Sequence, residues 1–350
     1  MGMTQYANAS SDYKEITYAV KDWVATVTLD RAKSYNAYST NTLVELAHAF
    51  RRAAFDDEVA VIVFTGAGDR AFCTGGDVKE YQANYTKKPR DYWKYMVLFG
   101  SYIESILNTG KPVIARLNGM AVGGGNESQL ACDLSIMAEH SYIKQVGTSV
   151  GSVAAGGSTQ WLPIFVGDRR ARYILMTNRK ILPHQALDWG LVNEVAPSVT
   201  KDGEFIVNAS AEQIKSAQAS EDGYSIDLTM LDQAVDKLAQ ELIEKFPESM
   251  RYTKQQVNFW KDLVWHQTIG HARDWLSIHY TSWEPLEGMS AFVEKRPVDY
   301  MKLRQQAAQG GSSEFRWGPY TQTCANCGEG DLPANFTFCG NCGSSLDSSQ

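Results

Sequence analysis

The first part of the chain alternates between short apolar stretches typical of strands and longer amphipathic stretches typical of helices. Residues 15–31 follow the period-2 pattern of two half-buried strands, with a turn at Lys21 and Asp22. Residues 39–57 then carry apolar side chains at helical spacing, behind the candidate N-caps Ser39 and Thr40. A continuous apolar strand pattern follows at 59–66. This order predicts an α/β domain.

The same alternation continues toward the middle of the chain, which supports one domain built from repeated strand and helix units. The further elements predicted by these patterns are strands at 112–117 and 134–138 and helices at 126–134, 168–177 and 183–189.

The rest of the chain differs in character from this domain. Residues 197–224 lack clear periodicity and gather polar and small side chains, which predicts an exposed insertion rather than core. Residues 227–306 carry several amphipathic patterns rich in Trp and Tyr, and we expect helices there. Residues 309–323 have the Gly/Ser content of a linker, so we place a domain boundary in this segment.

Composition and charge exclude several classes of protein. The 350 residues are 44% hydrophobic and 21% charged, which is ordinary for a globular protein. Apolar stretches fall short of the roughly 20 residues that a membrane helix needs. The first twenty residues lack both the basic and apolar regions of a signal peptide and the Arg-rich character of a transit peptide, so we expect a cytoplasmic protein. The net charge of -7 disfavours nucleic acid as the main ligand.

Two glycine-rich segments carry the sharpest chemical signal of the main domain. They are AFCTGGDVKE at 71–80 and NGMAVGGGNESQLACD at 118–133, and each follows a predicted strand. Glycine lets a backbone approach a ligand closely, and two amides aimed at one point form an oxyanion hole that stabilises negative charge on a carbonyl oxygen. Tight strand-to-helix turns are the alternative explanation. The second segment lacks the dinucleotide and P-loop patterns, so phosphate binding is not supported.

Together with RAKSYNA at 31–37, these segments resemble the crotonase (enoyl-CoA hydratase/isomerase) superfamily in motif order and spacing. The resemblance covers roughly residues 15–300. It implies an α/β core of repeated ββα units, here residues 1–226 with the insertion at about 197–224. It also implies a C-terminal helical region, here 227–308, that helps form a homotrimer or homohexamer. Acyl-CoA thioesters are the implied substrates, without a further cofactor for catalysis.

The resemblance assigns roles to individual residues. The backbone N–H groups of Gly76 and Gly124 would polarise the thioester carbonyl. Glu127 matches the first of two glutamates that activate water in enoyl-CoA hydratases, although the helix dipole alone also favours a glutamate in a first helical turn. Gly147 stands at the second glutamate, so one of the paired acid and base groups is missing.

Gly147 and the Gly-Ser that follows resemble the branch of 1,4-dihydroxy-2-naphthoyl-CoA synthase and the ring-opening hydrolases. Residues 279–300 place Tyr280 at the catalytic tyrosine of the synthase, whereas Ala154 replaces its aspartate. Residues 151–172 are most similar to the 6-oxocyclohex-1-ene-1-carbonyl-CoA hydrolases, which cleave a ring in anaerobic benzoyl-CoA degradation. The residues that this resemblance places at the substrate and its CoA are Lys33, Ala37, Thr74, Gly75, Asp77, Gly123, Ser152 and Lys295.

The favoured hypothesis is therefore a ring-opening hydrolase of an alicyclic oxo-enoyl-CoA thioester. Glu127 would activate water, and Tyr280 would orient the ring oxygen or enolate and donate a proton. Three alternatives remain open: a hydratase or isomerase that relies on Glu127 alone, a synthase-like enzyme acting on a carbon–carbon bond, and a non-catalytic scaffold that presents the C-terminal tail to a partner.

Four of the six cysteines lie in the C-terminal tail. Cys324 and Cys327 form one CxxC pair, and Cys339 and Cys342 form a second after 11 intervening residues. Four thiolates at this spacing suit one tetrahedral zinc, and this segment, 324–345, resembles a zinc ribbon. Four cysteines leave no open coordination position, so the ion would be structural. Iron in the same cage and a redox role of the CxxC pairs stay as alternatives.

Overall fold

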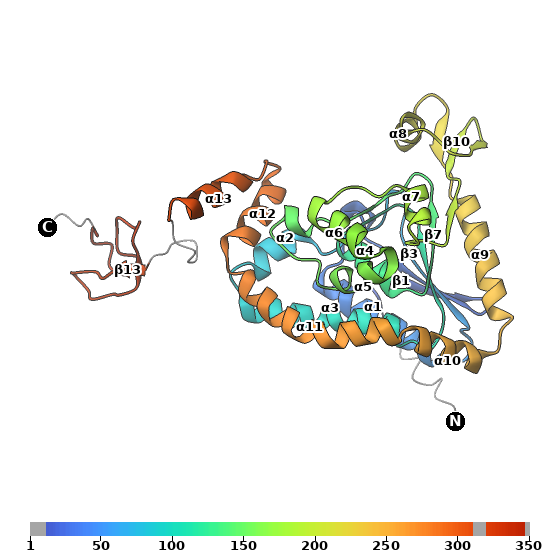
Figure 1. The fold of residues 1–350 in the computed structure, drawn as a ribbon, viewed down its shortest axis with the longest axis horizontal. Coiled ribbons are helices and arrows are strands. Elements are labelled where there is room, and N and C mark those ends of the chain that lie inside the picture. The colour runs from blue at the N-terminus through green and yellow to red at the C-terminus, as the bar shows by residue number, and fades with distance from the viewer. Residues whose placement is uncertain (1–11, 311–319, 347–350) are drawn as a thin grey trace.

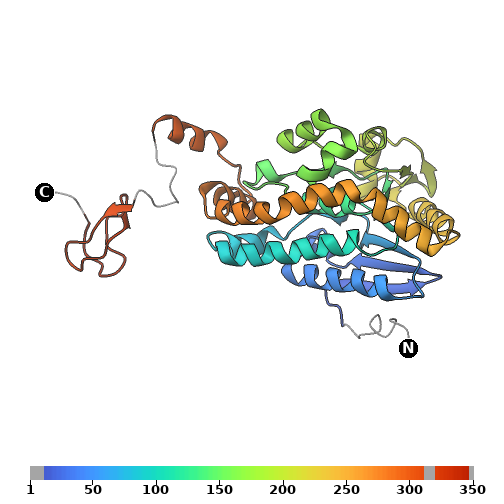
Figure 2. The same cartoon turned by 60° about the horizontal axis from the view of Figure 1, so that its bottom comes forward.

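The computed structural model describes residues 12–310 and 320–346. The first eleven residues, on which the prediction of a missing leader partly rests, lie outside the described residues, as does most of the predicted linker. Figures 1 and 2 show the main body as layered helices and strands.

A six-stranded sheet with the order β1-β2-β3-β5-β7-β9 forms the centre of the main body. Its first two strands form an antiparallel hairpin, and the others are parallel. The turn of the hairpin falls at Asp22 and Trp23, one residue later than predicted, because both residues have the positive φ (49° and 69°) of a tight two-residue turn. The strands are β1 Ile16–Lys21, β2 Val24–Leu29, β3 Val61–Gly66, β5 Val113–Leu117, β7 Leu134–Ala138 and β9 Glu194–Ala196.

A second, smaller sheet carries both glycine-rich segments. It consists of β4 Ala71–Cys73, β6 Met120–Val122 and β8 Ile143–Lys144, which are parallel and in the order β4-β6-β8. Because the carboxyl ends of parallel strands meet at the same edge of a sheet, the residues after β4 and β6 lie next to each other. The strands predicted before these segments are β3 and β5, whereas β4 and β6 lie inside the segments and were not predicted.

Four helices of the first half, at 40–55, 124–131, 168–177 and 183–188, were predicted, whereas those at 89–107 and 158–166 were missed. Ser39 caps the first one, where its Oγ accepts a hydrogen bond of 3.1 Å from the backbone N–H of Thr42. The helical elements up to residue 188 are a 3-10 turn at Ala32–Ser34, α1 Thr40–Phe55, α2 Val78–Glu80, a π turn at Tyr81–Tyr85, α3 Pro89–Leu107, α4 Gly124–Ala131, a 3-10 turn at Gly147–Ser149, α5 Ser158–Val166, α6 Asp168–Thr177 and α7 Pro183–Asp188.

Helices occupy most of residues 229–308, as predicted for residues 227–306. Figures 1 and 2 show α11 running beside α3, with α1 beyond it. A helix on the other side of the sheet, α9, packs Leu231 and Val235 against the strand residues Val61 and Ile114. The helices are α9 Thr229–Ile243, α10 Pro247–Val257, α11 Phe259–His279, α12 Trp283–Glu294 and α13 Tyr300–Ala308.

The six-stranded sheet is therefore buried on both faces. On β3, Val61 and Val63 contact the α9 side, whereas Ile62 and Phe64 belong to the larger core on the side of α1 and α3. This explains why residues 59–66 read as a continuous apolar run rather than an alternating one.

The predicted insertion at 197–224 is more regular than its sequence suggested. It forms a three-stranded antiparallel sheet of β10 Val199–Lys201, β11 Glu204–Ile206 and β12 Tyr224–Ile226, with α8 Ala211–Ala219 beside it. Asp202 and Gly203 make the hairpin turn, both with positive φ. Three-residue strands are too short to show periodicity, but this Asp-Gly pair was a readable hairpin signal.

The tail also begins earlier than predicted. Strand β13, Tyr320–Gln322, pairs with β14, Leu332–Pro333, so the ordered unit starts at 320 rather than 324. Residues 311–319 of the predicted linker lie outside the described residues.

Candidate functional site

A cavity of about 110 Å³ opens at the carboxyl edge of the small sheet. It brings together eight of the residues that the sequence assigned to catalysis or substrate, and it adds aromatic residues of α3 and the π turn. These eight are Thr74, Gly75, Gly76, Gly123, Gly124, Glu127, Ser152 and Tyr280.

The two glycine-rich segments approach each other at one wall of this cavity. A β-carbon on Gly75 would lie 2.8 Å from the backbone nitrogen of Gly124, and the positive φ of Gly75 (87°) also favours glycine. Within the described part of the chain, the backbone N–H groups of Gly76 and Gly124 donate no backbone hydrogen bond. Both amides are therefore available to a carbonyl oxygen in the cavity, which is the arrangement of an oxyanion hole.

Two phenol groups lie directly over these glycines. A β-carbon on Gly76 would lie 1.7 Å from the hydroxyl oxygen of Tyr81, and one on Gly124 would lie 1.8 Å from that of Tyr38. Any side chain at either position would displace a tyrosine. The glycines are thus required by this contact as well as by the turns that the sequence offered as the alternative.

Two buried asparagines fix the segment that leads into β4. The side-chain amides of Asn36 and Asn118 donate to the carbonyl oxygen of Ala71, at 2.7 and 3.0 Å. The side-chain oxygen of Asn36 accepts from the backbone N–H of Arg31, and that of Asn118 accepts from the backbone N–H of Gly66. Each side chain therefore donates through its nitrogen and accepts through its oxygen, and together they hold the start of β4 in one position.

Glu127 is buried on α4 and faces the cavity. One of its oxygens, Oε1, accepts hydrogen bonds from the backbone N–H groups of Gly156 (2.9 Å) and Ser158 (3.3 Å). Burial raises the pKa of Glu127 from the ordinary 4.5 to about 7, and these two hydrogen bonds oppose the rise. A carboxylate with a pKa near neutrality is well suited to accept a proton from water and return it.

Tyr280 directly follows α11 and lines the cavity. Its hydroxyl is 3.1 Å from Ser152 Oγ, and its ring stacks on Tyr92 with 3.7 Å between centroids. Burial raises the pKa of Tyr280, while hydrogen bonds from Ser152 and Tyr92 oppose the rise. A phenol with a raised pKa is protonated at neutral pH and can donate a hydrogen bond. Gly147 lines the same cavity, and no carboxylate replaces it there.

Four residues that the sequence assigned to CoA lie outside this cavity. Lys33 and Lys295 are exposed, and Lys295 follows α12 in a left-handed conformation. Ala37 is buried. The carboxylate of Asp77 caps α2 and pairs with Arg31 at 3.1 Å, which gives it a structural role beside Gly76.

The sequence reasoning missed a cluster of tyrosines on the π turn and α3. Their rings contact one another and Tyr280, with centroids 3.7–6.3 Å apart. The only sequence signal was the density of tyrosines between 81 and 95, which is equally typical of a packed core. The members of this cluster are Tyr81, Tyr85, Tyr92 and Tyr95.

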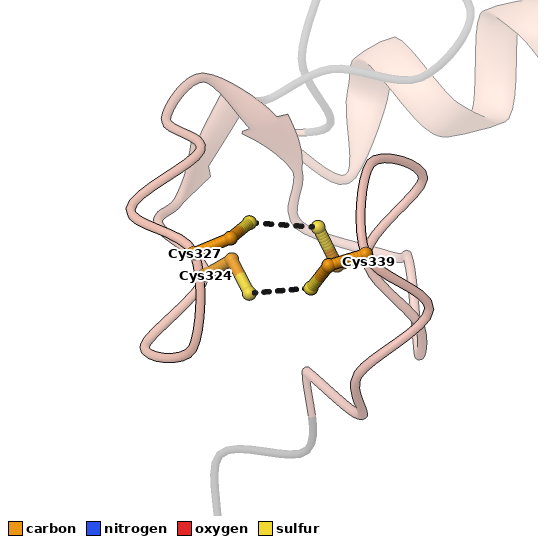
Figure 3. A group of neighbouring side chains, drawn as sticks. Cys324, Cys327 and Cys339 are labelled. Atoms are coloured by element: carbon orange, nitrogen blue, oxygen red, sulfur yellow. Dashed lines mark hydrogen bonds between the residues drawn. The ribbon is translucent and has the colours of Figure 1, made fainter.

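The tail brings its four cysteines together, as predicted. Their sulfurs all lie within 4.8 Å of one another, with Cys324 to Cys342 at 3.6 Å and Cys327 to Cys339 at 3.7 Å. Figure 3 shows sulfurs from the two CxxC pairs facing each other. Sulfurs about 2.3 Å from one tetrahedral ion would be about 3.8 Å apart, so this cage fits a metal ion. The other two cysteines, Cys73 and Cys132, are buried in the main core.

Among the residues that the structure describes, no helix combines the length and apolar character that a membrane crossing requires.

Comparison with known proteins places this geometry in a family. Residues 20–222 match the enoyl-CoA hydratase/isomerase family. The sequence is 34% identical over 334 residues to a 6-oxocyclohex-1-ene-1-carbonyl-CoA hydrolase of Geobacter metallireducens, covering 88% of this chain and 87% of that protein. A hydrolase of the same name from Thauera aromatica is 33% identical, with 81% and 82% covered.

Solved structures show the same fold. An enoyl-CoA hydratase of Bacillus anthracis superposes with a TM-score of 0.59 at 26% identity, covering 82% of this chain and 99% of that one. An enoyl-CoA hydratase of Mycobacterium avium subsp. paratuberculosis gives a TM-score of 0.66 at 23% identity, with 82% and 98% covered, and supports the fold alone. The motifs, the architecture and these relatives agree: the chain belongs to the enoyl-CoA hydratase/isomerase family, the crotonase superfamily.

Proposed function

We propose that this protein is a ring-opening hydrolase of 6-oxocyclohex-1-ene-1-carbonyl-CoA or a closely related single-ring thioester. One observation carries the proposal: a cavity with two free oxyanion amides holds one buried carboxylate, Glu127, and has Gly147 in place of a second. The relatives named above support the same activity. The cavity volume of about 110 Å³ suits one six-membered ring, since a cavity of about 150 Å³ holds benzene.

The first step would be the addition of water to the ring double bond. Gly76 and Gly124 hold the thioester oxygen, so electrons that move from the double bond are stabilised as an enolate. Glu127 takes a proton from water, and the resulting hydroxide forms a bond to the β-carbon of the ring. The α-carbon then takes up a proton, which completes the hydration.

The second step would open the ring. Glu127 deprotonates a second water, which attacks the ring ketone while Tyr280 and Ser152 bind the ketone oxygen. The bond between the ketone carbon and the α-carbon breaks, and its electron pair moves into the thioester enolate held by Gly76 and Gly124. The ketone carbon becomes a carboxylate, and protonation of the α-carbon gives a linear hydroxy dicarboxylate mono-thioester.

Mass spectrometry of the products tests this proposal directly. The purified protein is expected to convert 6-oxocyclohex-1-ene-1-carbonyl-CoA into a product heavier by two water molecules, whereas hydration alone adds one. A product that gains one water only, reversibly, would contradict the hydrolase and favour the hydratase alternative. Glu127→Gln is the matched variant, because it keeps the size of the side chain and removes the base.

Five finer properties belong to the same proposal. We infer that the tail holds a structural zinc ion on Cys324, Cys327, Cys339 and Cys342, because the sulfur spacing and the all-thiolate donor set suit that ion. We infer a homotrimer or homohexamer built through the helices at 227–308, as in the family. We also infer that the enzyme acts in the cytoplasm, that Lys33, Ala37, Asp77 and Lys295 lie along the CoA, and that the core ends near residue 226.

A further inference from the structure

The proposed reaction needs an acid that protonates the α-carbon, and none of the residues assigned so far has this role. Each half of the reaction ends with an enolate whose α-carbon must take up a proton, next to the oxyanion hole. Glu127 has just accepted a proton from water and lies on the side of Gly156 and Ser158. The hydroxyl of Tyr280 is 3.1 Å from the Oγ of Ser152, which we assign to the ketone oxygen of the ring. With Gly147 in place of the second glutamate, the α-carbon lacks an assigned donor.

Tyr81 stands where that donor is required. Its hydroxyl oxygen lies against Gly76, at 1.7 Å from the position a β-carbon would take, and it lines the cavity. A thioester whose oxygen binds the Gly76 amide places its α-carbon one bond beyond the carbonyl carbon, within reach of this hydroxyl. A phenol is protonated at neutral pH, so it can donate a proton without first being charged.

The surroundings of Tyr81 hold it in this place. It begins the π turn, where the backbone N–H of Thr86 donates to the Tyr81 carbonyl at 3.0 Å. The turn is anchored to α1, because Glu80 accepts hydrogen bonds from the backbone N–H (3.0 Å) and hydroxyl (2.7 Å) of Thr40. The Tyr81 hydroxyl bonds to that of Tyr95, and burial raises its pKa well above the ordinary value. π turns of this kind are frequent at functional sites.

We propose that Tyr81 is the catalytic acid that protonates the α-carbon of the thioester enolate, in the role of the missing second carboxylate, with Tyr95 as its positioning residue. The O–H bond of Tyr81 breaks as the new C–H bond forms, and the phenolate then regains the proton that Glu127 took from water. Both groups return to their starting states, and the sum is one water added. This inference rests on the proposed acyl-CoA chemistry, but it needs only the hydration step.

The test uses cyclohex-1-ene-1-carbonyl-CoA, a ring without the ketone, so that hydration is measured apart from ring opening. Tyr81→Phe is expected to lower kcat about 100-fold or more with little change in KM, in the range typical of a lost general acid. Tyr95→Phe is expected to cause a smaller loss. Tyr102→Phe is the matched control, because Tyr102 is a fully buried tyrosine of α3 outside the cavity lining, and it should keep the wild-type rate.

Deuterium labelling gives a second measurement that a merely structural role would not affect. In deuterated water the wild type should place deuterium on one face of the α-carbon, Tyr95→Phe should keep this preference, and Tyr81→Phe should lose it. A Tyr81→Phe enzyme within twofold of the wild-type kcat and with intact face preference would overturn the proposal. A wild type that hydrates this ring but does not open the oxo ring would overturn the hydrolase and leave Tyr81 supported by its own results. A wild type inactive on both rings overturns both.

Discussion

Replacing Glu127 by glutamine should stabilise the fold in a pH-dependent way, because the carboxylate is buried at a cost. Its pKa rises from the ordinary 4.5 to about 7 on folding. At about 1.4 kcal/mol per pKa unit, ionisation in the folded state costs about 3 kcal/mol relative to the unfolded chain. Glutamine has nearly the same shape, and its oxygen can still accept from the backbone N–H groups of Gly156 and Ser158.

The sign follows from the direction of this pKa change. Below the unfolded-state pKa near 4.5, both states are protonated and the wild type keeps its full stability. As the pH rises through about 7, the unfolded state ionises more readily than the folded one, so the wild type loses stability that Glu127→Gln keeps. The advantage of the variant should therefore grow by about 2–3 kcal/mol between pH 5 and pH 8.

Urea unfolding at pH 5 and pH 8, at one protein concentration, measures this difference. Other titrating groups are common to both proteins and cancel in the comparison. Glu212→Gln is the control, since Glu212 is exposed on α8, and it should show no change with pH. An advantage of Glu127→Gln that is equal at the two pH values would refute the reasoning that the site stores an unfavourable charge.

Three further predictions concern activity and metal. The kcat/KM for hydration should rise with pH to a plateau with a midpoint near 7, as Glu127 becomes a base, and this rising limb should be absent in Glu127→Gln; a flat wild-type profile would contradict the assignment. Gly124→Ala should lower kcat/KM by about 100-fold or more with an unchanged circular dichroism spectrum, because the new methyl would meet the Tyr38 hydroxyl and disturb an oxyanion donor. Cys339→Ser should lose the bound metal, measured by mass spectrometry of the elements, while ring opening continues at the wild-type rate; metal retained at full stoichiometry would contradict the four-thiolate site.

The backbone of the site was predictable because its signals are local. The hairpin at 15–31, the helix capped by Ser39 and the strand at 59–66 each follow from periodicity and capping within a few residues. Both glycine-rich segments follow strands, and parallel strands end at one edge of a sheet, which is where Gly76 and Gly124 lie. Glu127 follows from its position in the turn after Gly124.

The cluster of tyrosines on the π turn and α3, together with Tyr280, was not predictable in the same way. Tyr81 lines the cavity at the start of a π turn, and a five-residue turn leaves no periodic signal. Tyr92 and Tyr95 lie on the buried face of α3, where an aromatic residue is expected whether it lines a core or a cavity. Tyr280 was found through resemblance rather than through its own pattern. Distant contacts with Tyr81 and Ser152 decide its role, and these contacts are non-local.

The hydrogen bonds to the carbonyl oxygen of Ala71 connect the loop at 31–37, where we propose that the CoA lies, to the strand that leads into the oxyanion glycines. Asn36 fixes Ala71 and also accepts from the backbone of Arg31, whose side chain pairs with Asp77, the neighbour of Gly76. A ligand that binds to the loop at 31–37 would therefore influence the position of the Gly76 amide through these hydrogen bonds and this ion pair. Binding energy gained far from the thioester would be spent on aligning the Gly76 amide, so a thioester with a shortened carrier should lose turnover as well as affinity.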